Sequence, residues 1–202
     1  MRSGLIALLL LLTTFAHAHN PSDLRAYGQP TDTTLYLFTA PNCPHCAVFH
    51  KNVFPELIKK YVNTKRAQIL IVDMPADPNT LKAVLLFHCL PPEKSDRFMT
   101  WLYQKQSEWI DSSDVRSVFL PAVRQLGMST SDMDKCLNNV DLKDDIIDTR
   151  NHLRSLYNVD GTPTIAMRQG NVVKLYMGNN RRAILSGLEI DINKGEGLKK
   201  AQ

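Results

Sequence analysis

The pattern of apolar positions changes twice along the chain, and the changes predict a mixed α/β molecule. Apolar, β-rich runs at 34–38 and 67–72 are typical of strands. Between them, apolar residues from Val48 to Tyr61 recur at helical spacing, with a bend expected near Pro55. A strand, a long helix and a second strand in this order predict a right-handed crossover and a parallel strand pair.

The middle of the chain carries helical patterns only. From about residue 75 to residue 140, apolar spacing and the Pro and Gly signals indicate helices in succession. These helices are expected at 80–90, around 98–102, at 115–126 and at 131–138. We therefore interpret 75–140 as an all-helical domain inserted into the α/β unit, which is built from 19–74 and 141–190.

The last part of the chain is expected to return to the sheet. It should contain a helix at 142–157, a hairpin of strands at 164–168 and 172–177, and a helix at 181–188. Met167 and Met177 are interpreted as core residues of the hairpin. Residues 191–202, which include two glycines and a pair of lysines, are expected to form a flexible tail.

The first eighteen residues have the three parts of a secretory signal. A positive start at Arg2 precedes an apolar run at 5–15, and Ala16 and Ala18 form a small-x-small cleavage site. The apolar run is too short to span a bilayer comfortably, which disfavours the alternative of a membrane anchor. We therefore expect residues 1–18 to be a cleaved signal peptide and the mature chain to be soluble and exported, starting at His19.

Charge and cysteine content narrow the class of protein further. The formal net charge of +4 includes Arg2, so +4 − 1 = +3 remains after cleavage, and the charges are scattered without a basic stripe. Nucleic-acid binding therefore has little support. The chain contains four cysteines, an even number that fits the oxidising compartment implied by export.

Two of these cysteines, Cys43 and Cys46, lie two residues apart after the first predicted strand and at the start of a helical pattern. One helical turn brings their sulfurs within disulfide reach. It also leaves Cys43 at the positively polarised helix end, where a thiolate is stabilised. Pro44 suits a first helical turn, and the His45 ring can donate to the Cys43 sulfur. A stabilised thiolate stabilises the reduced form, so the disulfide would be a strong oxidant.

The spacing alone is also compatible with half of a zinc site or with a structural bridge. A second segment, Gly161 to Ile165, favours the redox interpretation. It places Pro163 at the start of a predicted strand, a position where proline is allowed in restricted settings such as a cis peptide in a tight turn.

The run from Phe38 to Cys46, together with Gly161 to Thr164, resembles the thioredoxin superfamily. The whole mature chain resembles its exported DsbA-like thiol-disulfide oxidoreductases. The resemblance implies a thioredoxin fold with an all-α helical domain inserted into it. It also implies a cis peptide between Thr162 and Pro163 that faces the dithiol and holds an extended substrate segment.

The remaining cysteines, Cys89 and Cys136, lie far apart inside the predicted helical domain. They do not supply the second closely spaced pair that a four-cysteine zinc site needs. We therefore expect a structural disulfide between them. The alternative is a second redox couple that feeds electrons to the first.

The chain departs from the family at one position. Members commonly keep a buried acid six residues before the nucleophilic cysteine, and this position is Leu37. His50 follows Cys46 by four residues and so lies on the same helical face, where it can relay the Cys46 proton. The alternative is a partly exposed surface histidine.

The sequence thus predicts a periplasmic dithiol oxidase that donates its Cys43–Cys46 disulfide to exported proteins. The resemblance implies reduced, unfolded polypeptides as substrates and a membrane quinone-linked partner for reoxidation. The chain is expected to be a monomer that needs no cofactor or metal. Two alternatives stay open: an isomerase or reductase of the same superfamily, and an exported copper-binding module in which Cys43, His45 and Cys46 hold the ion.

Overall fold

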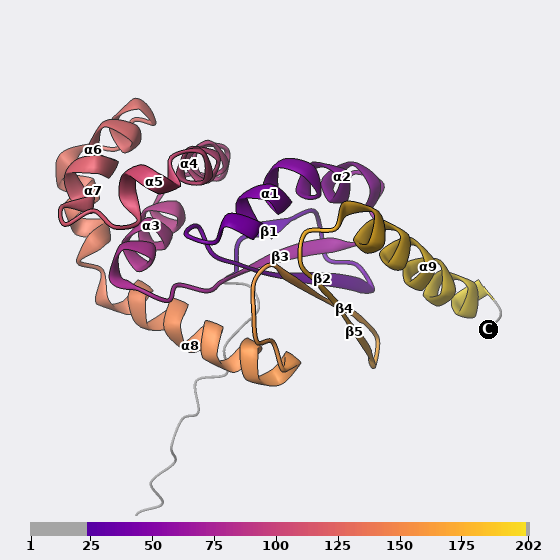
Figure 1. Ribbon diagram of the computed structural model, residues 1–202. Helices are drawn as coiled ribbons and strands as arrows, with labels where there is room; N and C mark the ends of the chain where they lie inside the picture. The colour runs from indigo at the N-terminus through magenta and orange to yellow at the C-terminus, as the bar shows by residue number, and fades with distance from the viewer. Residues whose placement is uncertain (1–23, 201–202) are drawn as a thin grey trace, which may run out of the picture.

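The computed structural model describes residues 24–200 of the chain. Its centre is a five-stranded mixed sheet with the strand order β1-β3-β2-β4-β5, and helices cover both faces (Figure 1). The strands are β1 (Ala26–Tyr27), β2 (Thr33–Thr39), β3 (Gln68–Asp73), β4 (Thr164–Gln169) and β5 (Val172–Met177). The expected signal peptide, 1–18, lies outside the described residues.

The predicted parallel pair and the predicted hairpin are both present. β2 and β3 are parallel, with Leu37 beside Ile71, and β4 is antiparallel to both β2 and β5. The short strand β1 was not predicted, because two residues are too few to show an alternating pattern. Ala26 of β1 pairs with Leu70 on the outer edge of β3.

The helix that follows the cysteine motif is interrupted near the expected bend. It consists of α1 (Pro44–Asn52), α2 (Phe54–Leu57) and the π-helical turn η2 (Ile58–Val62). Pro55 lacks the backbone N–H that would continue the hydrogen bonding of α1, so the chain restarts at α2. Phe49, Leu57 and Tyr61 remain on one side and are buried against the sheet.

The segment between β3 and the last sheet strands is helical. It contains α3 (Pro78–Cys89), α4 (Pro92–Gln104), α5 (Gln106–Trp109), α6 (Val115–Gln125) and α7 (Thr130–Leu137), which gather at one end of the sheet (Figure 1). Trp109 and Phe119 are fully buried in its core. A disulfide of 2.07 Å joins Cys89, at the end of α3, to Cys136 of α7, so the expected bridge is present.

The long helix α8 (Val140–Tyr157) returns the chain to the sheet on the face opposite α1 (Figure 1). Leu153 and Tyr157 of α8 are buried there, and the Tyr157 ring lies 4.9 Å from the ring of Tyr36 on β2. The sheet is therefore enclosed between α8 on one face and the motif helices and α9 on the other.

The C-terminal helix is longer than predicted. α9 spans Arg181–Lys200, so the expected flexible tail at 191–202 is wrong for its described part. Ile192 is fully buried and continues the helical spacing of Ile184 and Leu188. This burial outweighs the low helix propensity of the glycines that suggested a tail.

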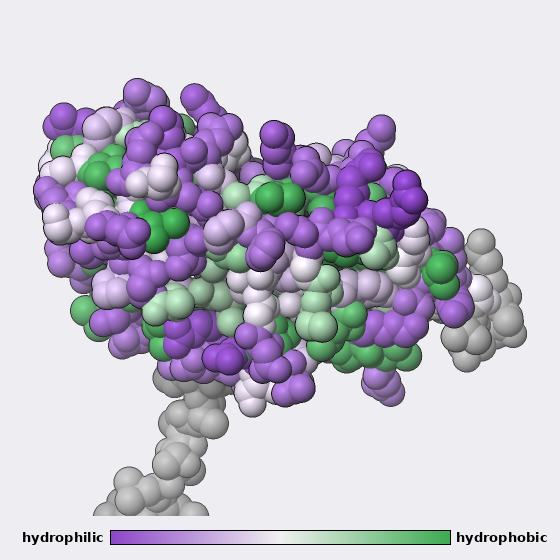
Figure 2. All heavy atoms as spheres, in the orientation of Figure 1, coloured by the Kyte–Doolittle hydropathy of each residue, from purple (hydrophilic) through white to green (hydrophobic). Residues whose placement is uncertain are grey.

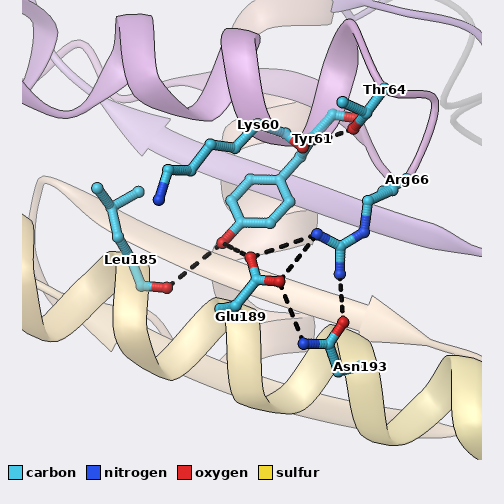
Figure 3. A network of polar contacts seen from close by, with 7 residues as sticks. All are labelled: Lys60, Tyr61, Thr64, Arg66, Leu185, Glu189 and Asn193. Carbon is cyan, nitrogen blue, oxygen red and sulfur yellow. Dashed lines mark hydrogen bonds and ion pairs between the residues drawn. The ribbon is translucent and has the colours of Figure 1, made fainter.

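A polar network also holds α9 against η2 (Figure 3). The Tyr61 hydroxyl donates to the Leu185 carbonyl at 3.3 Å and to Glu189 at 3.1 Å. Arg66 forms an ion pair of 3.0 Å with the same Glu189 and a hydrogen bond of 2.6 Å to Asn193. These contacts begin at Leu185, before residue 191, and extend beyond it to Asn193.

The surface in the view of Figure 2 is mostly hydrophilic, with hydrophobic side chains gathered over the hairpin. Met167 is buried as predicted, whereas Met177 is 73% exposed, so its assignment to the core is wrong. The reason is that β5 is an edge strand whose apolar row, Val173, Leu175 and Met177, is left partly uncovered. Among residues 24–200, no helix is long and apolar enough to cross a membrane.

Candidate active site

The cysteine motif lies at the carboxyl end of β2, where the chain turns into α1. Cys43 is the N-cap of α1, with φ −83° and ψ 119°, and its sulfur accepts a hydrogen bond from the Cys46 backbone N–H at 3.3 Å. Pro44 occupies the first helical turn, where its missing N–H costs nothing. Helix geometry therefore directs unpaired N–H groups and the positive end of the helix dipole toward the Cys43 sulfur.

The second predicted segment faces the motif. The Thr162–Pro163 peptide is cis, as expected, and the Cys43 thiol lies 3.5 Å from the Thr162 carbonyl oxygen. These residues are 119 positions apart in the chain. The antiparallel pairing of Phe38 with Thr164 joins them, because it sets the start of β4 beside the end of β2.

The two cysteines of the motif are free thiols with opposite acid strengths. A hydrogen bond from the Cys46 thiol is the largest cause that lowers the pKa of Cys43, to about 5. The Thr162 side chain and the backbone N–H groups of Cys46 and His45 act in the same direction, against the opposing effect of partial burial. Cys43 is therefore a thiolate at neutral pH.

Cys46 is almost fully buried, with 1% of its surface exposed. Its pKa is raised, first by its hydrogen bond to the Cys43 sulfur and then by burial, while the side chains of Thr162 and Thr39 act in the opposite direction. Cys46 therefore stays protonated, and the nucleophile of the pair is Cys43.

The side chain of His45 does not occupy the expected place. Its ring is exposed, and Nδ1 lies 3.2 Å from the side-chain amide of Asn179, in the loop after β5. The Cys43 sulfur accepts a hydrogen bond from the backbone N–H of His45, and the His45 ring does not donate to it. The expectation that the imidazole donates to the sulfur is corrected, because the helix start turns the ring outward.

His50 lies on the same side of α1 as Cys46, but its hydrogen bond is made elsewhere. Nε2 is 3.3 Å from the Thr100 hydroxyl, and the ring lies between Phe54 and Tyr103. Burial lowers the pKa of His50. His50 is therefore partly exposed, as the alternative expected, and its hydrogen bond is to Thr100 and not to the Cys46 sulfur. Leu37, at the position of the usual acid, is 3% exposed and belongs to the apolar core.

Two side chains that sequence reasoning missed hold the motif loop against the helical domain. The Gln106 side-chain amide donates to the Pro41 carbonyl at 2.8 Å and to the Cys43 carbonyl at 3.0 Å. Asn42 donates to Asp77, the N-cap of α3, at 2.9 Å. No local signal marks these residues, since each contact joins segments at least 35 positions apart.

The rim of the site combines exposed apolar and polar groups. Met177 pairs with Thr164, and the next residue, Gly178, donates its backbone N–H to the Pro163 carbonyl at 2.9 Å. Val48 of α1 is 42% exposed two residues after Cys46. Within 24–200, no group of three or more His, Cys, Asp or Glu side chains is arranged to hold a metal ion.

Comparison with known proteins agrees with this geometry. A family model described as thioredoxin matches residues 22–182. Proteins named as protein-disulfide oxidoreductases in Rickettsia typhi and Rickettsia prowazekii are 27% identical over 169 residues and 26% identical over 174 residues. These matches cover 83% and 86% of this chain, but only 63% and 64% of the relatives, so the chain spans less than two thirds of their length.

Solved structures share the fold. Wolbachia pipientis alpha-DsbA1 superposes with a TM-score of 0.74 at 20% identity, over 88% of this chain and 94% of that one. A protein-disulfide isomerase from Novosphingobium aromaticivorans gives 0.66 at 22% identity, over 81% and 96%. The predicted architecture, a sheet of thioredoxin type with an inserted helical domain, is therefore confirmed.

Proposed function

This chain belongs to the thioredoxin family, and on that premise we propose that it is a thiol:disulfide oxidoreductase which donates a Cys43–Cys46 disulfide to other polypeptides. The observation that carries the proposal is the opposition between the two thiols, one with its pKa lowered to about 5 and the other with its pKa raised. A pair of this kind favours the reduced state, and its disulfide is therefore an oxidant.

The exchange proceeds in two steps. A substrate thiolate attacks the Cys43 sulfur, the bond between Cys43 and Cys46 breaks, and its electron pair goes to the Cys46 sulfur, which takes up a proton. A second substrate thiol then loses its proton and attacks the substrate sulfur of the mixed disulfide. Cys43 leaves as the stabilised thiolate. The substrate is oxidised by two electrons, and the motif is reduced by two.

The surroundings of Cys43 support a polypeptide substrate. The loop at Thr162 and Pro163 offers backbone groups beside the sulfur, and Met177 and Val48 add exposed apolar surface at the rim. Reduced, unfolded exported proteins carry both features, namely free backbone groups and exposed apolar side chains. We assign the protein to the periplasm after cleavage of 1–18, as a monomer that a membrane quinone-linked partner reoxidises.

Equilibration with glutathione followed by thiol trapping tests the direction of the reaction. The motif disulfide should be much easier to reduce than Cys89–Cys136, and the oxidised protein should oxidise a reduced two-cysteine peptide. Cys43→Ser should abolish this oxidation, whereas Cys46→Ser should accumulate a covalent peptide adduct on Cys43. A motif disulfide as resistant to reduction as a structural one would contradict the oxidase and favour a reductase.

A further inference from the structure

Each opening of the Cys43–Cys46 disulfide leaves a new thiolate at Cys46, and each closing removes a proton from it. The Cys46 sulfur is buried, and the core residue Leu37 offers no acid beside it. The proton must therefore move through neighbouring polar groups of the protein.

A pair of buried hydroxyls lies next to Cys46. Thr39, the last residue of β2, lines the same small cavity as Cys46, and the interaction of its side chain with the Cys46 sulfur acts to lower the pKa of that thiol. The same Thr39 hydroxyl lies 2.8 Å from the hydroxyl of Tyr103 on α4, and either oxygen can donate. Thr39 is 5% exposed and Tyr103 is 9% exposed, so bulk water does not compete for this hydrogen bond.

The hydroxyl pair opens on a small cavity of about 20 Å³. Thr39, Cys46, His50 and Tyr103 all contribute to its walls, and the rest of the lining is largely apolar. About 10–15 Å³ is enough for one water molecule, so the cavity has room for a water that contacts the hydroxyls and the imidazole.

Burial keeps the Tyr103 phenol and the His50 imidazole beside this cavity neutral. Burial raises the pKa of the Tyr103 phenol well above its ordinary value and lowers the pKa of the His50 imidazole. The other groups that act here are Cys43, Tyr27, Asp73 and Asp96. Because the Tyr103 phenol does not ionise in the working pH range, it can pass a proton on only by donating one proton and accepting another in the same step.

We propose that the hydroxyls of Thr39 and Tyr103 conduct the proton between the Cys46 sulfur and water in this cavity. When the disulfide opens, Cys46 takes a proton from Thr39, which takes one from Tyr103, which takes one from the water. Solvent then restores the water. When the disulfide closes, the same shifts run in reverse. The inference deepens the proposed oxidoreductase function, on which it rests, and makes Thr39 and Tyr103 the proton-relay residues of the reaction.

The test isolates the step in which Cys46 loses its proton. A mixed disulfide between Cys43 and glutathione is prepared, and its intramolecular release of glutathione is followed from pH 5 to 9. Thr39→Val and Tyr103→Phe should each slow the release about 100-fold near neutral pH, the low end of general acid–base effects, and move the rise of the rate to higher pH. Thr39→Ser, which keeps the hydroxyl, should retain the wild-type profile.

Matched controls remove similar groups elsewhere. Thr33→Val changes a buried threonine at the other end of β2, and Tyr61→Phe removes a phenol hydroxyl of η2 that bonds α9. Both variants should release glutathione at the wild-type rate. Equal loss in Thr39→Ser and Thr39→Val, or wild-type profiles in Thr39→Val and Tyr103→Phe, would overturn the relay. Failure of the proposed function is distinct, because the wild-type protein would then not oxidise the model peptide at any pH.

Discussion

Cys43 and Cys46 are separated by a single helical turn, yet one is a partly exposed thiolate and the other a buried thiol. The difference arises from position, since only Cys43 stands at the N-cap, where backbone N–H groups have no helical partner. The Cys46 thiol adds the largest single contribution by donating a hydrogen bond to the Cys43 sulfur. The acidity of Cys43 therefore depends on Cys46 more than on His45.

This ranking gives a prediction at the residue scale. Alkylation of Cys43 in the wild-type reduced protein should be half-maximal near pH 5, the value to which its pKa is lowered. Cys46→Ala removes the donated hydrogen bond and should move this midpoint upward. His45→Ala keeps the backbone N–H and should move the midpoint less. A larger shift in His45→Ala than in Cys46→Ala would show that the imidazole is the main stabilising group after all.

At the scale of elements, sequence patterns predicted what depends on near neighbours. The parallel pair of β2 and β3, the break near Pro55 and the dithiol at the start of α1 all follow from local spacing. Contacts between distant segments could not be predicted in this way. Examples are the hydrogen bond of Gln106 to the motif loop and that between Tyr103 and Thr39. The residues 191–200 were misjudged because Gly195 and Gly197 are local signals, whereas the burial of Ile192 is tertiary.

The C-terminal part of α9 can be tested by a pair of isoleucines. Ile192→Ala removes a fully buried side chain and should lower the free energy of unfolding by about 2–5 kcal/mol. Ile190→Ala changes a side chain that is 55% exposed on the same helix and should cost much less. Urea titrations of both variants measure the difference. Equal, small losses would mean that this part of α9 does not pack on the sheet.

At the scale of the whole molecule, the helical domain and the sheet meet at the motif loop. Gln106 on α5 and Asp77 before α3 hold this loop from the helical side, while β2 and β4 hold it from the sheet side. The Cys89–Cys136 bridge stiffens the helical side by joining its first and last helices across 47 residues. We expect its role to be stability and not redox exchange.

Removal of this bridge should therefore separate stability from redox chemistry. In the chain-entropy account, a loop of this length stabilises the fold by about 4 kcal/mol, so the Cys89→Ala/Cys136→Ala variant should unfold at lower urea concentration. Its motif should still equilibrate with glutathione as in the wild type. The Cys43→Ala/Cys46→Ala variant is the matched control, since it keeps the long loop closed. A changed glutathione equilibrium in the bridge variant would instead indicate a second redox couple.

The separation of 119 positions between Cys43 and Thr162 determines when the site is completed. A nascent chain exposes the cysteine motif early, but β4, which carries Thr164 beside Phe38, is synthesised only after the whole helical domain. Closing a loop of this length is among the slower events of folding. Until β4 packs against β2, the loop of Thr162 and Pro163 does not lie beside the Cys43 sulfur. The order of synthesis thus delays a complete dithiol site until the helical domain, including its two bridged cysteines, has been made.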